Sequence, residues 1–254
     1  MGHQDSYYRQ NEAYAEHLAN WNPALYAKYA DTLQPPKTGA RVLDVGCGVG
    51  QVVARLQEAG FEAYGVDVSE PNIERARKVS EHCRLYDGKK LPFPDRHFAS
   101  AGALNVLEHV DEPEAFIREL TRVVEVGGRV VLSSPNFFRV FGLRDYHPRM
   151  RGLGNKWRNW KRLREKRRQM HSAPDEVRFD KMQPIVKEPF TPDDDAIVAT
   201  NALEMEFFLT RAGCEVESVS CCDRYVAKPM DFLLNLGPWR YGMLNSFLVA
   251  RRAR

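Results

Sequence analysis

The sequence has no apolar run near the roughly 18 residues that a membrane-spanning helix needs. Its five cysteines form no C-x-x-C pair, and the adjacent Cys221 and Cys222 are poorly placed to bridge each other. These absences argue against a membrane-spanning protein, a zinc site and a disulfide framework. They predict a protein with reduced thiols, located in the cytoplasm. The length of 254 residues suits one large domain, or one domain with a sizeable insert.

Strand-like apolar runs alternate with helical patterns over much of the chain, which predicts a parallel sheet with helices on both faces. The helix after residue 112 should begin with a capping box formed by Asp111 and Glu114 around Pro113. The expected strands are 41–46, 62–69, 83–88, 98–107, 127–136, 215–220 and 245–252, and the expected helices include 51–60, 70–79, 114–124 and 201–213.

The interval from about 136 to 195 fits no unit of this alternation. A structureless loop of that length is improbable in a compact domain, so we expect an insert with its own helices. The chain is therefore predicted to have four parts. They are an N-terminal helical cover (1–37), a ligand-binding core (38–136), a basic insert or substrate lid (137–195) and a C-terminal part that completes the core sheet (196–254).

The stretch "VLDVGCGVG", residues 42–50, places three glycines at alternate positions after an apolar strand. Such a strand-to-helix turn brings backbone N–H groups close to a ligand. The dinucleotide fingerprint is G-x-G-x-x-G, but its third glycine is replaced here by Gln51. Asp44 lies two residues before the first glycine and would repel a pyrophosphate. The loop therefore favours a cationic or zwitterionic ligand over the nicotinamide cofactor of an oxidoreductase.

Five stretches follow one another along the chain at workable spacing. They are "VLDVGCGVG", "YGVDVS", "YDGKKLPFPDRHFA", "ALNVLEHV" and "RELTRVVEVGGRVVLSSPN". In this order they resemble the motifs of class I S-adenosylmethionine-dependent methyltransferases, within them the small-molecule branch similar to the ubiquinone and menaquinone methylating enzymes. This resemblance implies a Rossmann-like, seven-stranded, mostly parallel sheet whose last strand is antiparallel, with S-adenosylmethionine as cofactor.

The resemblance also implies which residues bind the cofactor. The glycine-loop amides would face the methionine carboxylate and Asp44 its ammonium group, while Asp67 would accept from both ribose hydroxyls. Asp87 would accept from the adenine amino group, although "YDG" is also a favourable turn. Cys47 is expected to be a small buried residue rather than a reactive thiol. The predicted cofactor residues are Asp44, Gly46, Cys47, Gly48, Asp67, Val68, Asp87, Gly88 and Asn105, the last beside the sulfonium.

His109, just after the fourth strand of the core, is the candidate general base. The alternative is that His109 packs or caps beside Asp111. In quinone-type relatives an acid, a Glu and a His bind a divalent metal. Here Glu108 and His109 are present, but Asn105 occupies the position of the acid. Because adjacent residues also point in different directions, we predict no metal.

The segment after the fourth strand, "NVLE", lacks the N-P-P-Y, D-P-P-Y and Pro-Cys patterns of enzymes that methylate nucleic-acid bases. The absence of these patterns favours the oxygen of a small molecule or glycan as the methyl acceptor, with a small amine as the alternative. "SPNFF" followed by a basic insert and "DDDAIVATN" resembles methyltransferases of surface-polysaccharide pathways. A non-catalytic module that binds S-adenosylmethionine for regulation is a further alternative.

Residues 139–168 hold twelve lysines and arginines and two acids, so this segment carries +10 while the whole chain carries +3. Within it, 156–168 is predicted to be a helix with Trp157, Trp160, Leu163 and Met170 on one side. Three interpretations remain open. The helix could pair with the acids of 175–195, recognise an anionic acceptor such as a phosphate-linked sugar or lipid, or adhere to the anionic inner face of a membrane. Nucleic acid is disfavoured by "NVLE".

Overall fold

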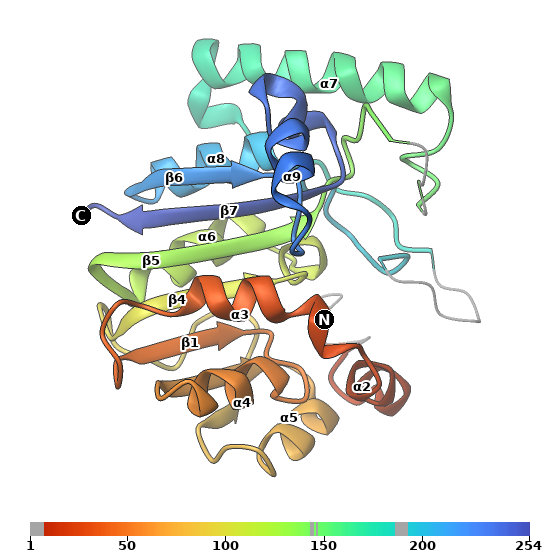
Figure 1. Cartoon of the computed structure of the whole chain (residues 1–254). Coiled ribbons are helices and arrows are strands. Elements are labelled where there is room, and N and C mark those ends of the chain that lie inside the picture. Colours follow the sequence, from red (N-terminus) through yellow and green to blue (C-terminus); the bar gives the residue numbers. More distant parts are fainter. Residues whose placement is uncertain (1–7, 143–144, 146, 186–192) are drawn as a thin grey trace.

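The computed structural model describes residues 8–142, 145, 147–185 and 193–254, and within them one mixed sheet organises the chain (Figure 1). Its strands follow the order β3-β2-β1-β4-β5-β7-β6, and β7 is antiparallel to both of its neighbours, β5 and β6. The predicted Rossmann-like sheet with an antiparallel last strand is confirmed. The strands are β1 (Arg41–Val45), β2 (Glu62–Asp67), β3 (Cys83–Leu85), β4 (Phe98–Leu104), β5 (Val124–Pro135), β6 (Cys214–Ser220) and β7 (Asn245–Arg252).

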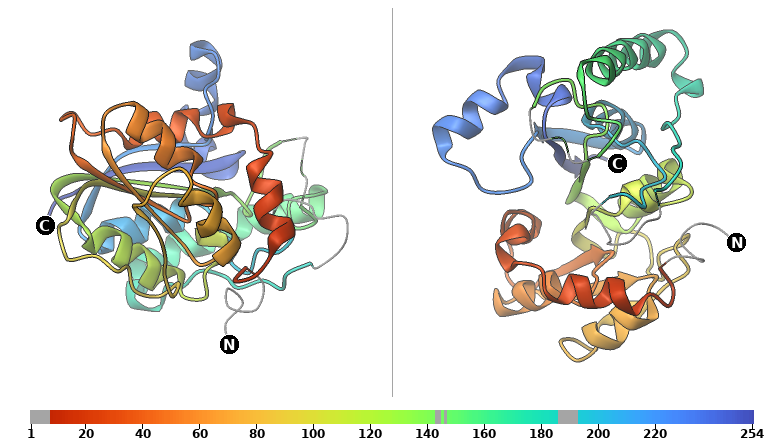
Figure 2. Two further views of the ribbon diagram at one scale, coloured as in Figure 1. Left: turned by 90° about the horizontal axis from the view of Figure 1, so that it is seen from below. Right: turned by 90° about the vertical axis from the view of Figure 1, so that its right-hand side faces the viewer.

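Helices cover both faces of the sheet (Figures 1 and 2). One face packs against α3 (Ala27–Leu33), α4 (Gln51–Glu58) and α5 (Glu70–Ala76) around the buried Tyr29 and Leu56. The other face packs against α6 (Pro113–Arg122) and α8 (Ala202–Arg211). The remaining elements are α2 (Glu12–Ala19), α7 (Leu153–Ser172), α9 (Lys228–Leu234) and the short turns η1 (Pro23–Leu25), η2 (Leu107–His109), η3 (Pro174–Glu176) and η4 (Gly237–Gly242).

The start of α6 differs from the sequence prediction. The helix begins at Pro113 with Glu112 at its N-cap position, and no side chain caps it. The Glu114 carboxylate instead accepts a hydrogen bond from the Phe179 backbone N–H at 2.9 Å. The predicted capping box is therefore wrong, because Glu114 is recruited by a segment 65 residues away. By contrast, the Ser69 side chain caps α5 by accepting from the Asn72 N–H.

The insert contains a longer helix than predicted, α7. Its one buried residue is Asn159, whose Nδ2 donates to the carbonyl oxygens of Phe137 (3.2 Å) and Arg139 (3.1 Å). Trp157 is exposed and stacks on Trp160, with ring centroids 4.8 Å apart. The carbonyls of the chain leaving β5 therefore anchor α7 through Asn159, while Trp157 stays at the surface.

One cation of α7 meets an acid of the segment 175–195 that was expected to pair with it. Lys166 Nζ lies 2.8 Å from Asp180 Oδ1, and it also lies 2.8 Å from Oε1 of Glu204, which is outside that segment. Leu163 and Met170, which were predicted to share one side of the helix, pack against buried clusters. In the part of the chain that the structure describes, no helix combines the length and the apolar character that crossing a membrane requires. The four-part division of the chain stays a prediction.

Candidate cofactor and acceptor site

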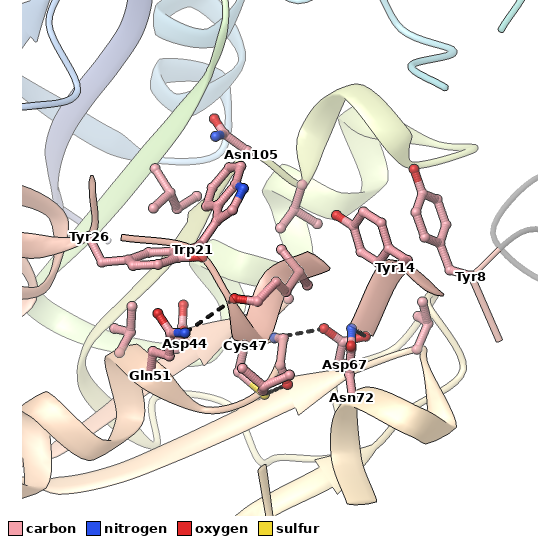
Figure 3. A pocket seen from close by; sticks show the side chains of 18 of the residues that line it. Tyr8, Tyr14, Trp21, Tyr26, Asp44, Cys47, Gln51, Asp67, Asn72 and Asn105 are labelled. Atoms are coloured by element: carbon pink, nitrogen blue, oxygen red, sulfur yellow. Dashed lines mark hydrogen bonds between the residues drawn. The ribbon is translucent and has the colours of Figure 1, made fainter. Parts of the chain in front are cut away.

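A cavity lies at the carboxyl ends of β1, β2 and β4, where parallel sheets of this type bind ligands (Figure 3). The loop after β1 and the end of β2 form one side. The N-terminal cover contributes aromatic side chains, and the end of β4 with η2 contributes Asn105 and His109. Among the predicted cofactor residues, the cavity is lined by Asp44, Gly46, Cys47, Gly48, Asp67, Val68 and Asn105.

The glycine loop is fastened to β2. Gly46 has a φ of +75°, and a Cβ there would lie 2.3 Å from Val106 Cγ2, so only glycine fits. The N–H groups of Gly46 and Cys47 donate to the Val66 carbonyl at 2.8 and 3.0 Å. The expectation that these two amides face a ligand is therefore wrong in this conformation. Their hydrogen bonds hold the loop in shape instead.

Asp67 ends β2, and its carboxylate is held in place by hydrogen bonds from three donors. Oδ2 accepts from the Gly48 N–H at 2.9 Å, and Oδ1 accepts from the Ser69 N–H at 2.9 Å and from Asn72 Nδ2 at 3.3 Å. Burial raises the pKa of Asp67, and these donors act in the opposite direction. Figure 3 shows Asp67 and Asn72 side by side on the wall of the cavity.

Asp44 is almost fully buried on β1, and its Oδ1 accepts from the Tyr29 hydroxyl at 2.8 Å. Burial raises the pKa of Asp44 to about 7, while the hydrogen bond from Tyr29 lowers it and the charge of Asp67 raises it further. A carboxylate in this environment is stabilised by a cationic neighbour. The position therefore suits the ammonium group of a ligand.

Asp87 and Gly88 do not line the cavity with the other predicted residues. Asp87 is exposed, and its Oδ1 accepts from the N–H groups of Lys89 and Lys90, each at 2.9 Å. The side chain thus closes a turn, which was the alternative interpretation of "YDG". Tyr86, the preceding residue, is buried and lines the cavity in its place.

Asn105, at the end of β4, has a left-handed backbone with a φ of +53°. Its side-chain Oδ1 is buried and accepts no hydrogen bond from the described residues. Asparagine tolerates this backbone better than most residues, and strain of this kind concentrates at functional sites. In Figure 3 Asn105 lies beside Trp21 at the cavity. Both features support Asn105 as a ligand-contacting residue.

His109 lies at the far end of the cavity, in contact with residues from two distant segments. Its Nδ1 is 2.8 Å from the Tyr8 hydroxyl and 3.7 Å from Asp195 Oδ2. The Tyr8 hydroxyl also donates to Asp195. Because Tyr8 has one hydroxyl proton and gives it to Asp195, its oxygen accepts from His109 Nδ1–H. This arrangement leaves Nε2 of His109 as the atom that can take up a proton.

Glu108, His109 and Asp193 could hold a cation. One ligand atom from each lies within 4.8 Å of the others, and Glu108 Oε1 is 3.8 Å from His109 Nε2. The argument that adjacent residues must point apart is therefore wrong for this pair. Burial raises the pKa of Glu108 to about 7, and the neighbouring His109 opposes that rise. The absence of a metal stays a prediction.

Sequence reasoning missed the aromatic wall that the N-terminal cover brings to the cavity. Trp21 Nε1 donates to His17 Nε2 at 2.9 Å, which fixes the indole within the cover. The concentration of aromatics in a polar N-terminal segment was the available signal, but it predicted only a helical cover. The lining residues from this segment are Tyr8, Tyr14, Leu18, Trp21, Tyr26 and Tyr29.

A family model described as a methyltransferase domain matches residues 14–176. The chain belongs to this family. It is 34% identical over 110 residues to 27-O-demethylrifamycin SV methyltransferase of Amycolatopsis mediterranei, which covers 39% of each chain. It is 32% identical over 105 residues to a ubiquinone biosynthesis O-methyltransferase of Alkalilimnicola ehrlichii, covering 39% of this chain and 42% of the relative. The matches thus span about two fifths of these curated relatives.

Solved structures agree over nearly the whole chain. An S-adenosylmethionine-dependent methyltransferase from Mesorhizobium loti has a TM-score of 0.58 at 18% identity and covers 90% of this chain and 98% of its own. A similar structure from Listeria monocytogenes has a TM-score of 0.59 at 12% identity, with coverages of 91% and 99%. At these identities the likeness shows the fold, which is that of the predicted methyltransferase class.

Proposed function

We propose that the chain transfers a methyl group from S-adenosylmethionine to an oxygen of a small molecule or glycan. Family membership and the reactions named for the relatives support this function. The observation that carries it is the pairing of two features in one cavity. Two buried carboxylates, Asp44 and Asp67, line one side, and the His109 cluster lies at the other end.

The cavity residues fit the proposed cofactor. When bound, S-adenosylmethionine supplies an electrophilic methyl group on a positively charged sulfur. Asp44 offers a carboxylate to the ammonium group, and Asp67 is held by its donors where it can accept from the ribose hydroxyls. Tyr86, whose N–H donates to the Asp67 carbonyl, would offer apolar surface to the adenine, and Trp21, beside Asn105, would exclude water from the methyl group. Gln51 in the loop disfavours the rival nicotinamide cofactor.

On the acceptor side, the chain would orient a hydroxyl and remove its proton. Nε2 of His109 would accept that proton, because Nδ1 is held by Tyr8. Asp195 stabilises the resulting imidazolium through Tyr8 and by its own charge at 3.7 Å. A base is needed most when the nucleophile arrives protonated and weakly acidic, so this cluster favours O-methylation over the alternative, N-methylation of a small amine.

The charge of α7 supports an acceptor that is itself anionic or carried on an anionic group. None of the described residues that line the cavity comes from α7, so its cations would act on a part of the acceptor outside the cavity. A phosphate-linked sugar or lipid has this character. Because Lys166 is already paired with Asp180 and Glu204, the other basic residues of α7 would make the contact.

The test measures binding and turnover separately. Calorimetry with S-adenosylhomocysteine should show binding, and labelled S-adenosylmethionine should transfer its methyl to phenolic or sugar hydroxyls before amines. His109→Gln should lower kcat by about 10²–10⁴-fold and leave S-adenosylhomocysteine affinity unchanged. The control His97→Gln changes a half-buried histidine just before β4, at the opposite end of the sheet from the cavity, and should leave both unchanged.

Three results would count against the proposal. Binding without turnover on any acceptor would favour the non-catalytic regulatory module. Binding of NAD in place of S-adenosylhomocysteine would favour an oxidoreductase. Equal loss of kcat in both histidine variants would remove His109 as the base.

A further inference from the structure

The segment between β6 and β7 turns an apolar surface toward the solvent. Its helix, α9, has no buried residue, and Phe232 and Leu233 are 67% and 62% exposed. In α9 the polar Asp231 and Asn235 are less exposed than these two apolar residues. We name the exposed set the apolar tip. It comprises Tyr225, Val226, Met230, Phe232, Leu233, Leu236 and Trp239.

The amphipathic arrangement of α9 is the reverse of that expected in water. On the helix, Met230, Phe232 and Leu233 fall on the side opposite Asp231, and Asn235 caps the end of the helix. The polar side holds the segment to the body, because Asn235 Oδ1 accepts from the Cys221 N–H at 2.8 Å and Asn235 Nδ2 donates to Asp231. A surface helix normally buries its apolar side. We therefore infer that the exposed apolar side of α9 contacts apolar surroundings outside the protein.

The apolar tip lies at the same edge of the sheet as the cavity. Strand β6 is parallel to β5, since both are antiparallel to β7, so its carboxyl end at Ser220 lies at the cavity edge. The chain that leaves β5 at this edge joins the same surface, where Phe141 packs against Trp239 with ring centroids 5.1 Å apart. Figure 2 shows α9 projecting from the body of the molecule.

The shape and the charge of this surface favour a lipid bilayer as its occupant. The apolar tip projects outward, which suits insertion among acyl chains. Arg224 and Lys228 are exposed beside it, and residues 224–242 hold three cations and one acid. Tyr225 and Trp239 are of the residue types that sit at the level of lipid headgroups. Exposed apolar and aromatic residues flanked by cations are typical of helices that bind anionic membrane interfaces.

We propose that the apolar tip docks the protein on an anionic phospholipid surface and thereby turns the cavity edge toward the membrane. The acceptor would then be drawn from the bilayer, as a molecule with a lipid tail. The naming of the acceptor class rests on the proposed methyl transfer, whereas the docking itself does not. This surface is distinct from the basic helix α7, which the sequence singled out for membrane contact.

The experiment measures binding of the full chain to vesicles by co-sedimentation, without cofactor or acceptor. Vesicles contain phosphatidylcholine and phosphatidylglycerol in equal parts, or phosphatidylcholine alone. The wild-type protein should partition onto the anionic vesicles more strongly. Phe232→Ser combined with Leu233→Ser should lower this partition at least about tenfold, because two inserted side chains are lost. Both residues are exposed, so the melting temperature should be unchanged.

The matched control removes two exposed apolar residues from α7, Leu153→Ser with Trp157→Ser, and should bind vesicles like the wild type. Equal binding by the wild type and the apolar-tip variant would overturn the proposal, as would loss of binding in the α7 variant alone. Light scattering without lipid gives a further check. A wild-type dimer that the apolar-tip substitutions convert to a monomer would identify a second copy as the occupant and also overturn it. Failure of methyl transfer would leave all of these results unaffected.

Discussion

The two sides of the cavity differ in how their carboxylates are held. On the cofactor side, Asp67 accepts from three donors and Asp44 from Tyr29. On the acceptor side, Glu108 Oε1 and Asp195 Oδ1 are buried beside His109 and accept no hydrogen bond from the described residues. The carboxylates of the first side are therefore held in place by donors of the chain, while those of the second keep acceptor capacity. Substitutions on the first side should alter ligand binding, and substitutions on the second should alter turnover.

The largest effect should come from Asp67. We expect Asp67→Ala to weaken S-adenosylhomocysteine binding about 100-fold, because it removes a charged acceptor and frees the loop amide of Gly48. Asp87→Ala is the matched control, since its carboxylate closes an exposed turn, and should change the affinity less than about threefold. Calorimetry measures both. A loss with Asp87→Ala as large as with Asp67→Ala would restore the adenine role predicted from the sequence.

The next largest effect should be on stability, through the contact that anchors helix α7 of the insert. Asn159→Ala should lower the free energy of unfolding by about 1–3 kcal/mol, because the carbonyls of Phe137 and Arg139 lose their shared donor. Trp157→Ala, two residues away on the exposed side of α7, should cost less than about 0.5 kcal/mol. Urea titration compares them. The reverse order would mean that α7 is held by its aromatic residues rather than by Asn159.

The smallest effect should be a pH dependence of cofactor binding that arises from Asp44, on the cofactor side of the cavity. The pKa of Asp44 is raised to about 7, so its carboxylate becomes neutral as the pH falls through that value. An ammonium-bearing ligand prefers the charged form, and S-adenosylhomocysteine should bind up to about tenfold more weakly at pH 6 than at pH 8. Asp44→Asn should abolish this dependence.

Tyr29→Phe is a second test of whether Asp44 is the group that titrates. It removes the hydrogen bond that lowers the pKa of Asp44, so the midpoint of the pH dependence should move to higher pH. Calorimetry across the pH series would detect the shift. An unchanged midpoint in Tyr29→Phe, or a persistent pH dependence in Asp44→Asn, would assign the titration to another group.

The sequence places Asp44 and Asp67 at the cavity because their positions depend on local strand patterns, whereas it wrongly expects Asp87 and Gly88 there. Asp44 lies on β1, and Asp67 ends β2, so their positions follow once the strands are recognised. Patterns of alternating strand and helix also fix the order of elements that surround them. The parallel sheet then brings these acids to one edge without any knowledge of side-chain contacts.

The sequence does not predict the acceptor side, because its contacts join distant segments. Tyr8 meets His109 across 101 residues and Asp195 across 187. Glu114 binds Phe179 rather than completing a capping box, and Asn159 rather than Trp157 anchors α7. For Glu114 and Asn159, a backbone group brought in by tertiary structure decides the contact rather than the local sequence pattern.

The hydroxyl of Tyr8 has a consequence for the order of events in catalysis. It belongs to the N-terminal cover that lines the cavity, and it also fixes which nitrogen of His109 bears a hydrogen. Lifting the cover to admit or release ligands would break that contact and leave the imidazole free to exchange tautomers. The pocket would then be either open to ligands or equipped with an oriented His109. An open pocket would therefore not promote transfer of the methyl group to water.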